Sequence, residues 1–527
     1  MSSIFLNVKK SKIQSITLIY AAFIAGLCSI IYELLIATTT SFFLGDSVKY
    51  FSLTIGMYMA AMGVGSFTSK YMHQNLIRKF IIVELTLGIL GALSVPVLYF
   101  SYSFTTIFIM VYVLFTLILG FLIGLEIPFL TRLMERYNEL KFNIANILSF
   151  DYLGALIATI CFPFLLLPYF GIYQSSLIFG LINVSIGFII IKVFAKEIGI
   201  IWKKLMVCTI FFTLIIILMI CYSNWVLGAW DSYLFEDQII YNKQTQYQKI
   251  TLTKYKEDIR LYLDGSLQFS SIDEHRYHES LIHVPLATQS NEIKRVLLLG
   301  AGDGLAVREL LKYSYIEEIV LVDLDAGVTE LAIENPYLKK INENSLKDSR
   351  VRVVISDAFT FLSNNKKPFD FIISDLPDPK NNELARLYSQ QFYKLVKRNL
   401  SVYGIFTTQA TSPYFATDAF WCIHKTLKQA KFDYVYPYHV QIPSFGDWGF
   451  VMASSLKRNI QNPTLNIPTR FLDTNIYKKL FLFEKDIQRT NISVNELDKG
   501  ILLNYYLNGW RYYSRLLRTF WVLLLYY

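Results

Sequence analysis

The 527-residue sequence predicts a multi-span α-helical membrane domain, followed by a small β-hairpin region and an α/β Rossmann-like doubly wound domain. Three observations predict this order. Residues 1–230 are almost continuously apolar, residues 231–290 contain short alternating strands, and residues 291–470 alternate apolar strands with helical stretches. Residues 471–527 are expected to form a helical tail, whose apolar end either lies in the membrane interface or packs on the membrane domain.

The composition agrees with a membrane protein. Hydrophobic residues make up 54% of the chain and charged residues 17%, and the mean hydropathy of +0.38 is too apolar for a wholly soluble protein. The net charge of +9 does not indicate nucleic acid as a partner, because many Lys and Arg lie in short loops between apolar runs. Four of the five cysteines lie in apolar runs, so neither a disulfide framework nor a metal site is predicted.

Apolar stretches of about 20 residues, the length that crosses a bilayer core, predict about seven membrane spans. They lie near residues 14–37, 50–69, 80–100, 104–127, 144–168, 174–194 and 205–222. Positive residues recur in alternate loops, near 70–79, 132–141 and 192–204, which favours a cytoplasmic position for these loops and for the N-terminus. We therefore expect a multi-pass protein of the cell membrane with the lipid bilayer as a partner. The side of the membrane that holds the following domain stays open, as does the oligomeric state, a homo-oligomer included.

Four acidic residues lie inside or at the edges of the apolar runs: Glu33, Glu84, Glu126 and Asp151. Charges at that depth are costly unless they are paired or face a polar cavity. They indicate either a polar pathway for a cationic solute or hydrogen bonds that hold the helices together.

The next region predicts strands around a tight turn. QKITLTKY, IRLYLDG and SLQFSS alternate apolar and polar residues, and Asp264-Gly265 between the last two is typical of a two-residue hairpin turn. From residue 295 onward, the runs VLLLG, EIVLVD, VRVVISD, FDFIISD and GIFTTQA alternate with helical stretches, which predicts a parallel doubly wound sheet.

Acidic residues follow successive strands of this predicted sheet. They are Asp303, Asp323, Asp357, Asp375 and Asp378. Because the carboxyl ends of parallel strands meet at one edge, where ligands bind, the sequence predicts a negatively charged cleft there.

A glycine-rich turn of Gly300, Gly302 and Gly304 follows the first of these strands and opens a helix, as in many dinucleotide or adenosylmethionine proteins. A purely structural turn is the alternative. Asp323, about twenty residues later, is placed to accept hydrogen bonds from ribose hydroxyls, although it could also cap a helix.

Seven blocks of the sequence together resemble the spermidine synthase (polyamine aminopropyltransferase) family, in a membrane-bound form. They are YQKITL, LYLDGSLQFSSIDEHRYHESLIHVPL, LLLGAGDG, VLVDLD, DSRVRVVISDAFTFL, FDFIISDLPDP and LYSQQFYKLVKRNL, between about residues 240 and 455. The resemblance implies transfer of an aminopropyl group from decarboxylated S-adenosylmethionine to an amine such as putrescine. The products would be spermidine and 5′-methylthioadenosine, and no cofactor or metal would be required.

The resemblance also implies roles for individual residues. Asp375 resembles the catalytic aspartate that accepts a proton from the attacking amine. The residues that resemble the amine-binding set are Asp303, Tyr277, His278 and Asp378. Those that resemble the nucleoside contacts are Gln248, Gly300, Gly302, Asp323, Asp357 and Ala358.

The chemistry of carboxylates agrees with these roles, because an amine is a nucleophile only when neutral and a diamine arrives doubly protonated. The acids can bind one ammonium group and take a proton from the other. The decarboxylated donor is cationic and has no carboxylate, so it suits an acidic pocket better than intact adenosylmethionine does. Two alternatives stay open: an adenosylmethionine-dependent methyltransferase, and a polyamine sensor or carrier, which Glu33 and Asp151 motivate.

The sequence departs from the family in two places. KNNELARLYS after Pro379 lacks a Gly-Pro pair that is common in soluble members, and Phe445 stands where a tyrosine contacts the amine. The acceptor amine is therefore not predicted.

Overall fold

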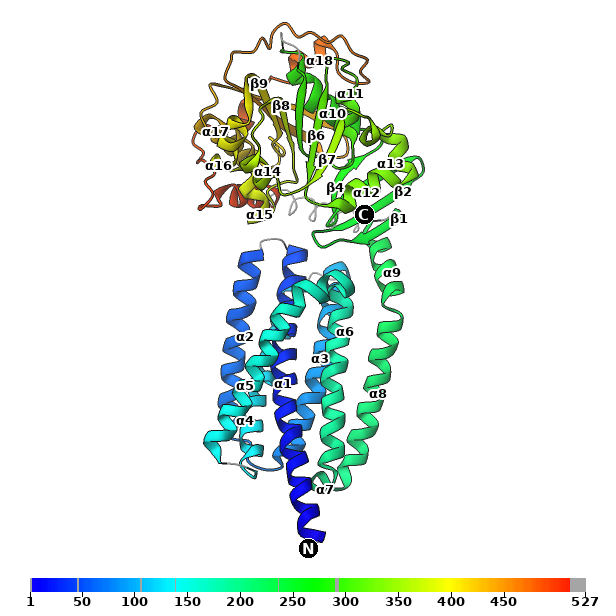
Figure 1. The fold of residues 1–527 in the computed structure, drawn as a ribbon, viewed down its shortest axis with the longest axis vertical. Coiled ribbons are helices and arrows are strands. Elements are labelled where there is room, and N and C mark those ends of the chain that lie inside the picture. Colours follow the sequence, from blue (N-terminus) through cyan, green and yellow to red (C-terminus); the bar gives the residue numbers. More distant parts are fainter. Residues whose placement is uncertain are drawn as a thin grey trace, which may run out of the picture. The chain divides into compact units, whose positions relative to one another are not determined.

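The protein consists of two compact units, Met1–Glu236 and Asp237–Tyr527 (Figure 1). The computed structural model describes residues 2–511, except 45–46, 105–106, 138, 236 and 290–292. The apolar extension from 515 to 527, which the sequence places in the interface or against the membrane domain, lies outside the described residues.

The first unit is a bundle of long apolar helices (Figure 1). They are α1 (Ser2–Leu44), α2 (Ser47–Ser69), α3 (Leu76–Phe104), α4 (Phe108–Met134), α5 (Leu140–Cys161), α6 (Leu167–Val193) and α8 (Trp202–Cys221), with the short helix α7 (Ala195–Ile198) and α9 (Ser223–Phe235). In the described part of the chain, six helical segments are long and apolar enough to cross a membrane.

The sequence predicts about seven spans, one more than these six helical segments. The two counts differ because the segment Leu140–Val193 counts as one, although it is 54 residues long. A straight helix of that length would extend roughly 80 Å, far more than a bilayer core. The backbone leaves the helical region at Gly171 (φ 68°, ψ 179°). Gln14 hydrogen-bonds with both Tyr137, just before α5, and Glu197, just after α6, at 3.1 and 2.7 Å. Both ends of the segment therefore lie at the same end of the bundle, so it folds back on itself and contains two of the predicted helices.

The acidic residues in the bundle take two kinds of position. Glu84 on α3 and Glu126 on α4 are only 1% and 2% exposed, and their carboxyl groups are neighbours. Glu33 and Asp151 are half-buried. The contact between Glu84 and Glu126 fits the prediction of hydrogen bonds between helices.

The second unit begins with an antiparallel sheet in the order β1-β2-β3-β4. Its strands are β1 (Gln238–Gln244), β2 (Lys249–Tyr255), β3 (Asp258–Leu263) and β4 (Ser266–Ser270). Asp264 and Gly265 join β3 to β4 with φ angles of 49° and 74°. Positive φ at both positions is what a type I′ hairpin turn requires, so the predicted turn is confirmed.

The main sheet has seven strands in the order β10-β11-β9-β8-β5-β6-β7. They are β5 (Arg295–Gly300), β6 (Glu318–Asp323), β7 (Val351–Ile355), β8 (Phe369–Asp375), β9 (Leu400–Gln409), β10 (Tyr434–Ile442) and β11 (Gly446–Ser454). Strands β5 to β9 are parallel, as predicted, whereas β10 and β11 add an antiparallel hairpin at one edge. The strand order reverses between β5 and β8, where ligands bind in doubly wound sheets.

Helices cover both faces of this sheet because successive side chains of a strand point to opposite faces. Val296 and Leu298 pack in the same core as α10 (Glu274–Leu286) and α11 (Leu305–Leu311). Leu297 and Leu299 pack in the opposite core, with α14 (Ala358–Asn364), α16 (Gln390–Arg398) and α17 (Thr417–Gln429). All four leucine and valine side chains are 0% exposed, which explains why the strand reads as a continuous apolar run.

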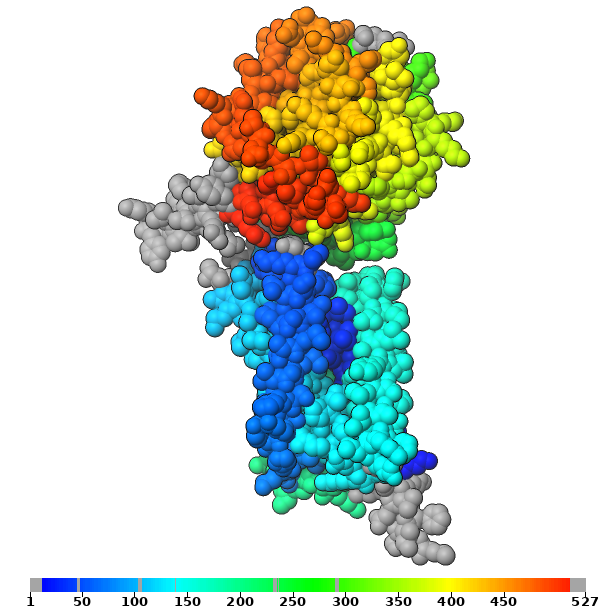
Figure 2. All heavy atoms as spheres, turned by 90° about the vertical axis from the view of Figure 1, so that its left-hand side faces the viewer, coloured from blue at the N-terminus to red at the C-terminus, as the bar shows by residue number. Residues whose placement is uncertain are grey.

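The remaining helices of this unit are short. They are α12 (Ala326–Glu334), α13 (Pro336–Ile341), α15 (Asn382–Ala385) and α18 (Thr474–Lys479). A last described helix, residues 501–511, packs through Leu502 in the same core of the second unit as α14, α16 and α17. Figure 2 shows this C-terminal segment, in red, on the surface of the second unit.

Candidate active site

The site lies where β5 and β8 end side by side. Gly300, the last residue of β5, pairs with Asp375, the last residue of β8. A Cβ atom on Gly300 would lie 2.1 Å from the Asp375 carbonyl oxygen, and the backbone φ of Gly300 is 83°. Glycine is therefore required here both for the close approach of the strands and for the left-handed backbone.

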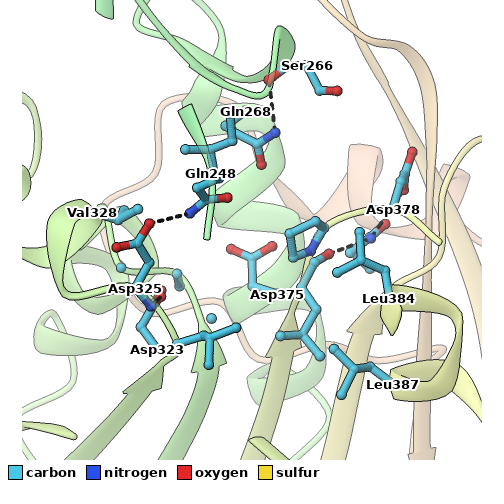
Figure 3. A pocket seen from close by; sticks show the side chains of 18 of the residues that line it. Gln248, Ser266, Gln268, Asp323, Asp325, Val328, Asp375, Asp378, Leu384 and Leu387 are labelled. Atoms are coloured by element: carbon cyan, nitrogen blue, oxygen red, sulfur yellow. Dashed lines mark hydrogen bonds between the residues drawn. The ribbon is translucent and has the colours of Figure 1, made fainter. Parts of the chain in front are cut away.

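A cavity of about 330 Å³ opens at this point. Figure 3 shows the Asp375 carboxylate directed into it, between the side of Gln248 and Asp325 and the side of Asp378. Every residue that the sequence assigned to the site lines this cavity: Gln248, Tyr277, His278, Gly300, Gly302, Asp303, Asp323, Asp357, Ala358, Asp375 and Asp378. The topology thus brings together residues that are up to 130 positions apart in the chain.

Asp375 is a half-buried carboxylate at the wall of the cavity, with one oriented oxygen. Its Oδ1 accepts a hydrogen bond of 2.5 Å from the hydroxyl of Tyr277. Burial raises the pKa of Asp375 to about 6, while the neighbouring His278 and the Tyr277 hydrogen bond act to lower it. A carboxylate with a raised pKa is a stronger base than an exposed one, and it is still mostly ionised at neutral pH.

His278 is held as a cation by a buried ion pair. Its Nδ1 donates to Glu274 Oε2 at 2.8 Å, and Arg308 binds both oxygens of Glu274 at 2.9 and 3.0 Å. Burial alone would lower the pKa of His278, but Glu274 and the nearby Asp303 and Asp375 raise it to about 9. Sequence reasoning did not identify Glu274 and Arg308, which act on the site through His278.

Asp303 occupies the glycine-rich turn. Its Oδ1 accepts a hydrogen bond from the backbone N–H of Leu305 at 2.9 Å, at the start of α11. Burial raises the pKa of Asp303, and His278 opposes that shift. The turn therefore presents a carboxylate, held by a helix N-terminus, to the same cavity as Asp375.

Asp378 is held at the far side of the cavity. Its two oxygens accept hydrogen bonds from Gln409 Nε2 at 3.2 Å and from Thr411 Oγ1 at 3.3 Å. Burial raises the pKa of Asp378 to about 6, against the opposing effect of Tyr506 and these two partners. Asp375 and Asp378 thus form two separately supported carboxylates in one cavity.

Asp323 and Gln248 lie at the other end of the cavity, with Asp325 (Figure 3). Asp323 accepts a hydrogen bond from the Asp325 N–H at 2.9 Å, and burial raises its pKa to about 6. Gln248 Nε2 donates to Asp325 Oδ2 at 3.1 Å, and Thr245 donates to the same oxygen at 2.7 Å. Asp325, which the sequence analysis did not select, therefore orients Gln248.

Asp357 lines the cavity but has two protein partners. One oxygen caps α14 by accepting from Thr360 N at 2.9 Å, and the other pairs with Arg386 at 2.6 Å. Ala358 follows it as the first residue of that helix. Asp357 is therefore a helix cap, and a nucleoside contact would have to share these oxygens.

Two further residues line the cavity, and no sequence pattern predicted either of them as a site residue. Lys380 donates to the Ser266 hydroxyl at 3.2 Å and so links the loop after β8 to the hairpin strand β4. Tyr506 comes from the helix of residues 501–511. Over the described ranges, no three His, Cys, Asp or Glu side chains are grouped to hold a metal ion.

Fold and site together define a doubly wound α/β domain with an acidic cleft that suits a nucleoside and a cationic amine. The comparisons agree, since residues 274–464 match the spermine/spermidine synthase domain. The chain is 40% identical over 487 residues to a polyamine aminopropyltransferase of Leptospira interrogans, covering 92% of this chain and 96% of the relative. It is 38% identical over 510 residues to that of Oceanobacillus iheyensis, covering 95% and 98%. The chain belongs to the polyamine aminopropyltransferase (spermidine synthase) family.

The family resemblance predicted from the seven blocks is thereby confirmed. The protein is a transferase of aminopropyl groups, with decarboxylated S-adenosylmethionine as the co-substrate of its family. These matches extend over both units, because they cover more than nine tenths of the chain. A solved spermidine synthase of Thermotoga maritima aligns with 47% of this chain and 86% of that one, at 26% identity and a TM-score of 0.44.

Proposed function

We propose that the protein transfers the aminopropyl group of decarboxylated S-adenosylmethionine to a primary amine such as putrescine, giving spermidine and 5′-methylthioadenosine. One observation carries this proposal. Asp375 and Asp378 are both half-buried, both have a pKa that partial burial raises to about 6, and both line one cavity that also holds Asp303. Such a cluster suits a doubly protonated diamine, which must lose a proton from its attacking nitrogen while its other nitrogen stays protonated.

In the proposed reaction, Asp375 accepts the proton that the attacking ammonium group loses. The amine nitrogen lone pair then forms a bond to the aminopropyl carbon that is attached to sulfur, the bond between this carbon and sulfur breaks, and its electron pair returns to sulfur. The sulfonium thus becomes a neutral thioether, and no further reactant is needed. Tyr277 orients Asp375 for this step through the 2.5 Å hydrogen bond.

The other roles follow from position along the cavity. We assign Asp303, Tyr277, His278 and Asp378 to the aminopropyl and amine groups. We assign Gln248, Gly300, Gly302, Asp323, Asp357 and Ala358 to the nucleoside. The end of the cavity with Asp323 suits a ribose. Asp323 ends β6, the strand after the glycine-rich turn, which is where doubly wound nucleotide-binding domains carry the acid that binds ribose hydroxyls.

The test is release of methylthioadenosine by purified protein given the decarboxylated donor and a panel of amines. We expect product with at least one diamine and a loss of about 10²- to 10⁴-fold in kcat for Asp375→Asn, which removes a general base. Asp370→Asn is the matched control, because Asp370 lies on the same strand but bonds to the backbone of Lys294 and Arg295. Full activity of Asp375→Asn would exclude the proposed base.

We also propose that the first unit is a multi-pass domain of the cell membrane. Large apolar side chains are exposed on its helices, such as Met110 (69%), Phe164 (76%) and Trp225 (72%). A contiguous surface of this kind is costly in water and favourable in lipid.

Hydrogen bonds within the bundle support an orientation. Arg132 donates to the Met72 carbonyl and Arg136 to Glu197, which gathers the basic loops at one end. Helix α8 starts at this end, so Cys221 at its other terminus lies at the opposite end of the bundle. Under the positive-inside rule, we propose that the end with Cys221 faces away from the cytoplasm.

A membrane-impermeant maleimide tests this orientation on intact cells. Cys221 and Lys203 are both exposed in the structure. We expect the reagent to label Cys221 of the wild-type protein from outside, and not to label the Cys221→Ser variant. When Lys203→Cys is added to Cys221→Ser, the new cysteine should be labelled only after the cells are permeabilised. The opposite pattern would reverse the orientation, and recovery of the protein in the soluble fraction would exclude membrane insertion.

A further inference from the structure

The C-terminal helix, residues 501–511, docks on the catalytic unit although it lies outside the residues that match the family domain. Leu502, Tyr506 and Trp510 are spaced by four residues and so share one face of the helix. Leu502 is 0% exposed, and the Trp510 ring stacks on Phe415 with centroids 5.2 Å apart. This face of the helix therefore packs against the rest of the second unit.

The start of this helix is fixed beside the cavity wall. Asn495 is 1% exposed, and its Nδ2 donates to the carbonyl of Ala385, the last residue of α15, at 2.9 Å. Its Oδ1 accepts from the Leu502 N–H at 3.4 Å. Since Leu384 of α15 also lines the cavity, the helix is anchored to a wall of the site on one side and to Phe415 on the other.

Tyr506 lies between these two anchors and lines the cavity. Its hydroxyl interacts with the Asp378 carboxylate, which raises the pKa of Tyr506 beyond the effect of burial and lowers that of Asp378. The phenol thus remains protonated and acts as the donor. It is a third support for Asp378 beside Gln409 and Thr411.

Other aromatic side chains line the cavity, but none of those described next offers a free hydroxyl group to Asp378. Phe445 packs between Tyr277 and Trp448, with ring centroids 6.4 and 5.2 Å away, and has no polar atom on its ring. The Tyr277 hydroxyl is already engaged by Asp375. Beside the Thr411 hydroxyl, the phenol hydroxyl near Asp378 therefore comes from a different segment of the chain, at Tyr506.

We propose that Tyr506 is a positioning and specificity-determining residue of the amine subsite, which orients the Asp378 carboxylate toward the distal ammonium group of a primary diamine. The inference rests on the proposed aminopropyl transfer. It assigns the C-terminal helix a part in acceptor recognition, so the end of the amine subsite is built partly from a segment that the family domain does not contain.

The test compares Tyr506→Phe with Tyr505→Phe in the full-length protein. Both changes remove one phenol oxygen from the same helix, but the Tyr505 hydroxyl accepts from the Ser493 N–H at 3.4 Å, outside the cavity. For Tyr506→Phe we expect the KM for the diamine to rise on the order of tenfold, as for loss of a hydrogen bond to a charged group. The KM for the nucleoside donor and the melting temperature should stay unchanged, and Tyr505→Phe should behave as the wild type.

A double substitution shows whether Tyr506 affects amine binding through Asp378 or independently of it. If Tyr506 acts through Asp378, Tyr506→Phe should add nothing to the amine KM in an Asp378→Asn background. An unchanged amine KM in Tyr506→Phe, or equal losses in donor KM and melting temperature, would overturn the proposal. Absence of methylthioadenosine from the wild-type protein with every amine would instead refute the aminopropyl transfer on which it rests.

Discussion

The hydroxyl of Tyr277 donates a 2.5 Å hydrogen bond to Oδ1 of Asp375, and the two residues come from different parts of the fold. Tyr277 lies on α10, which covers one face of the sheet, and Asp375 ends the central strand β8. The hydrogen bond holds Oδ1, and the carboxylate is directed into the cavity (Figure 3). The carboxylate that we propose as the base is thereby oriented by a residue of the protein itself.

Tyr277→Phe tests this orientation. The ring contact with Phe450, at 5.1 Å between centroids, would be kept, so the fold should be little affected. We expect kcat to fall roughly 10- to 100-fold, because a hydrogen bond to a charged group is worth about 1.5–3 kcal/mol. Steady-state kinetics measure this, and an unchanged kcat would show that Asp375 needs no orienting group.

The pH dependence of the reaction should show an acidic limb. Burial raises the pKa values of Asp375 and Asp378 to about 6, and the reactive form of each is the carboxylate. Activity should therefore be complete above about pH 7 and decline as the pH falls through 6. Because both groups take up a proton there, log(kcat/KM) should fall with a slope steeper than one per pH unit. A limb near pH 4 would contradict the buried environment of both acids.

The ion pair behind the site should matter more to stability than a surface pair. In Arg308→Met, Glu274 and His278 would remain buried without the guanidinium, and loss of one partner of a buried pair costs about 3–5 kcal/mol. Arg295→Met is the control, because its pair with Glu318 is partly exposed and should contribute no more than about 1 kcal/mol. Thermal unfolding of the two variants gives the comparison, and equal melting temperatures would show that the buried network is not needed.

The glycine at the strand ends should be irreplaceable. Gly300→Ala would place a Cβ 2.1 Å from the Asp375 carbonyl and would adopt a φ of 83°. Gly265→Ala is a matched control, because its φ is also positive, at 74°, but nothing lies within 4 Å of the added atom. Both should lose about 1–2 kcal/mol to backbone strain, whereas only Gly300→Ala should also displace Asp375 and abolish activity. Similar kinetics for both variants would refute this explanation.

Several features of the site could be predicted because they depend on local pattern. Asp375 follows an apolar run that only a buried strand explains, and the turn at Asp303 follows another. Parallel strands end at one edge, so the order of strands and acids in the chain was enough to bring these carboxylates together. The hairpin at Asp264 and Gly265 was predictable for a similar reason, since few residues accept positive φ twice in succession.

Other features depend on contacts between distant segments. The ion-pair partner of Asp357 is Arg386, 29 positions later. One partner of Asp378, beside Gln409 and Thr411, is Tyr506, beyond the residues that match the family domain. Neither residue stands in a pattern that distinguishes it from an ordinary surface arginine or helix tyrosine. The two predicted spans within Leu140–Val193 are antiparallel, which follows from the contacts of Gln14 with Tyr137 before the segment and Glu197 after it.

The sequence by itself therefore determined the two units, the doubly wound sheet and the acids at its edge. These follow from the period of apolar residues and from turn chemistry, which act over a few neighbouring positions. Only the tertiary structure decided which partners each acid has, such as Tyr277 for Asp375 and the start of α14 with Arg386 for Asp357. Burial and hydrogen bonding set the charge and direction of a carboxylate, and both depend on side chains that the chain brings together from far apart.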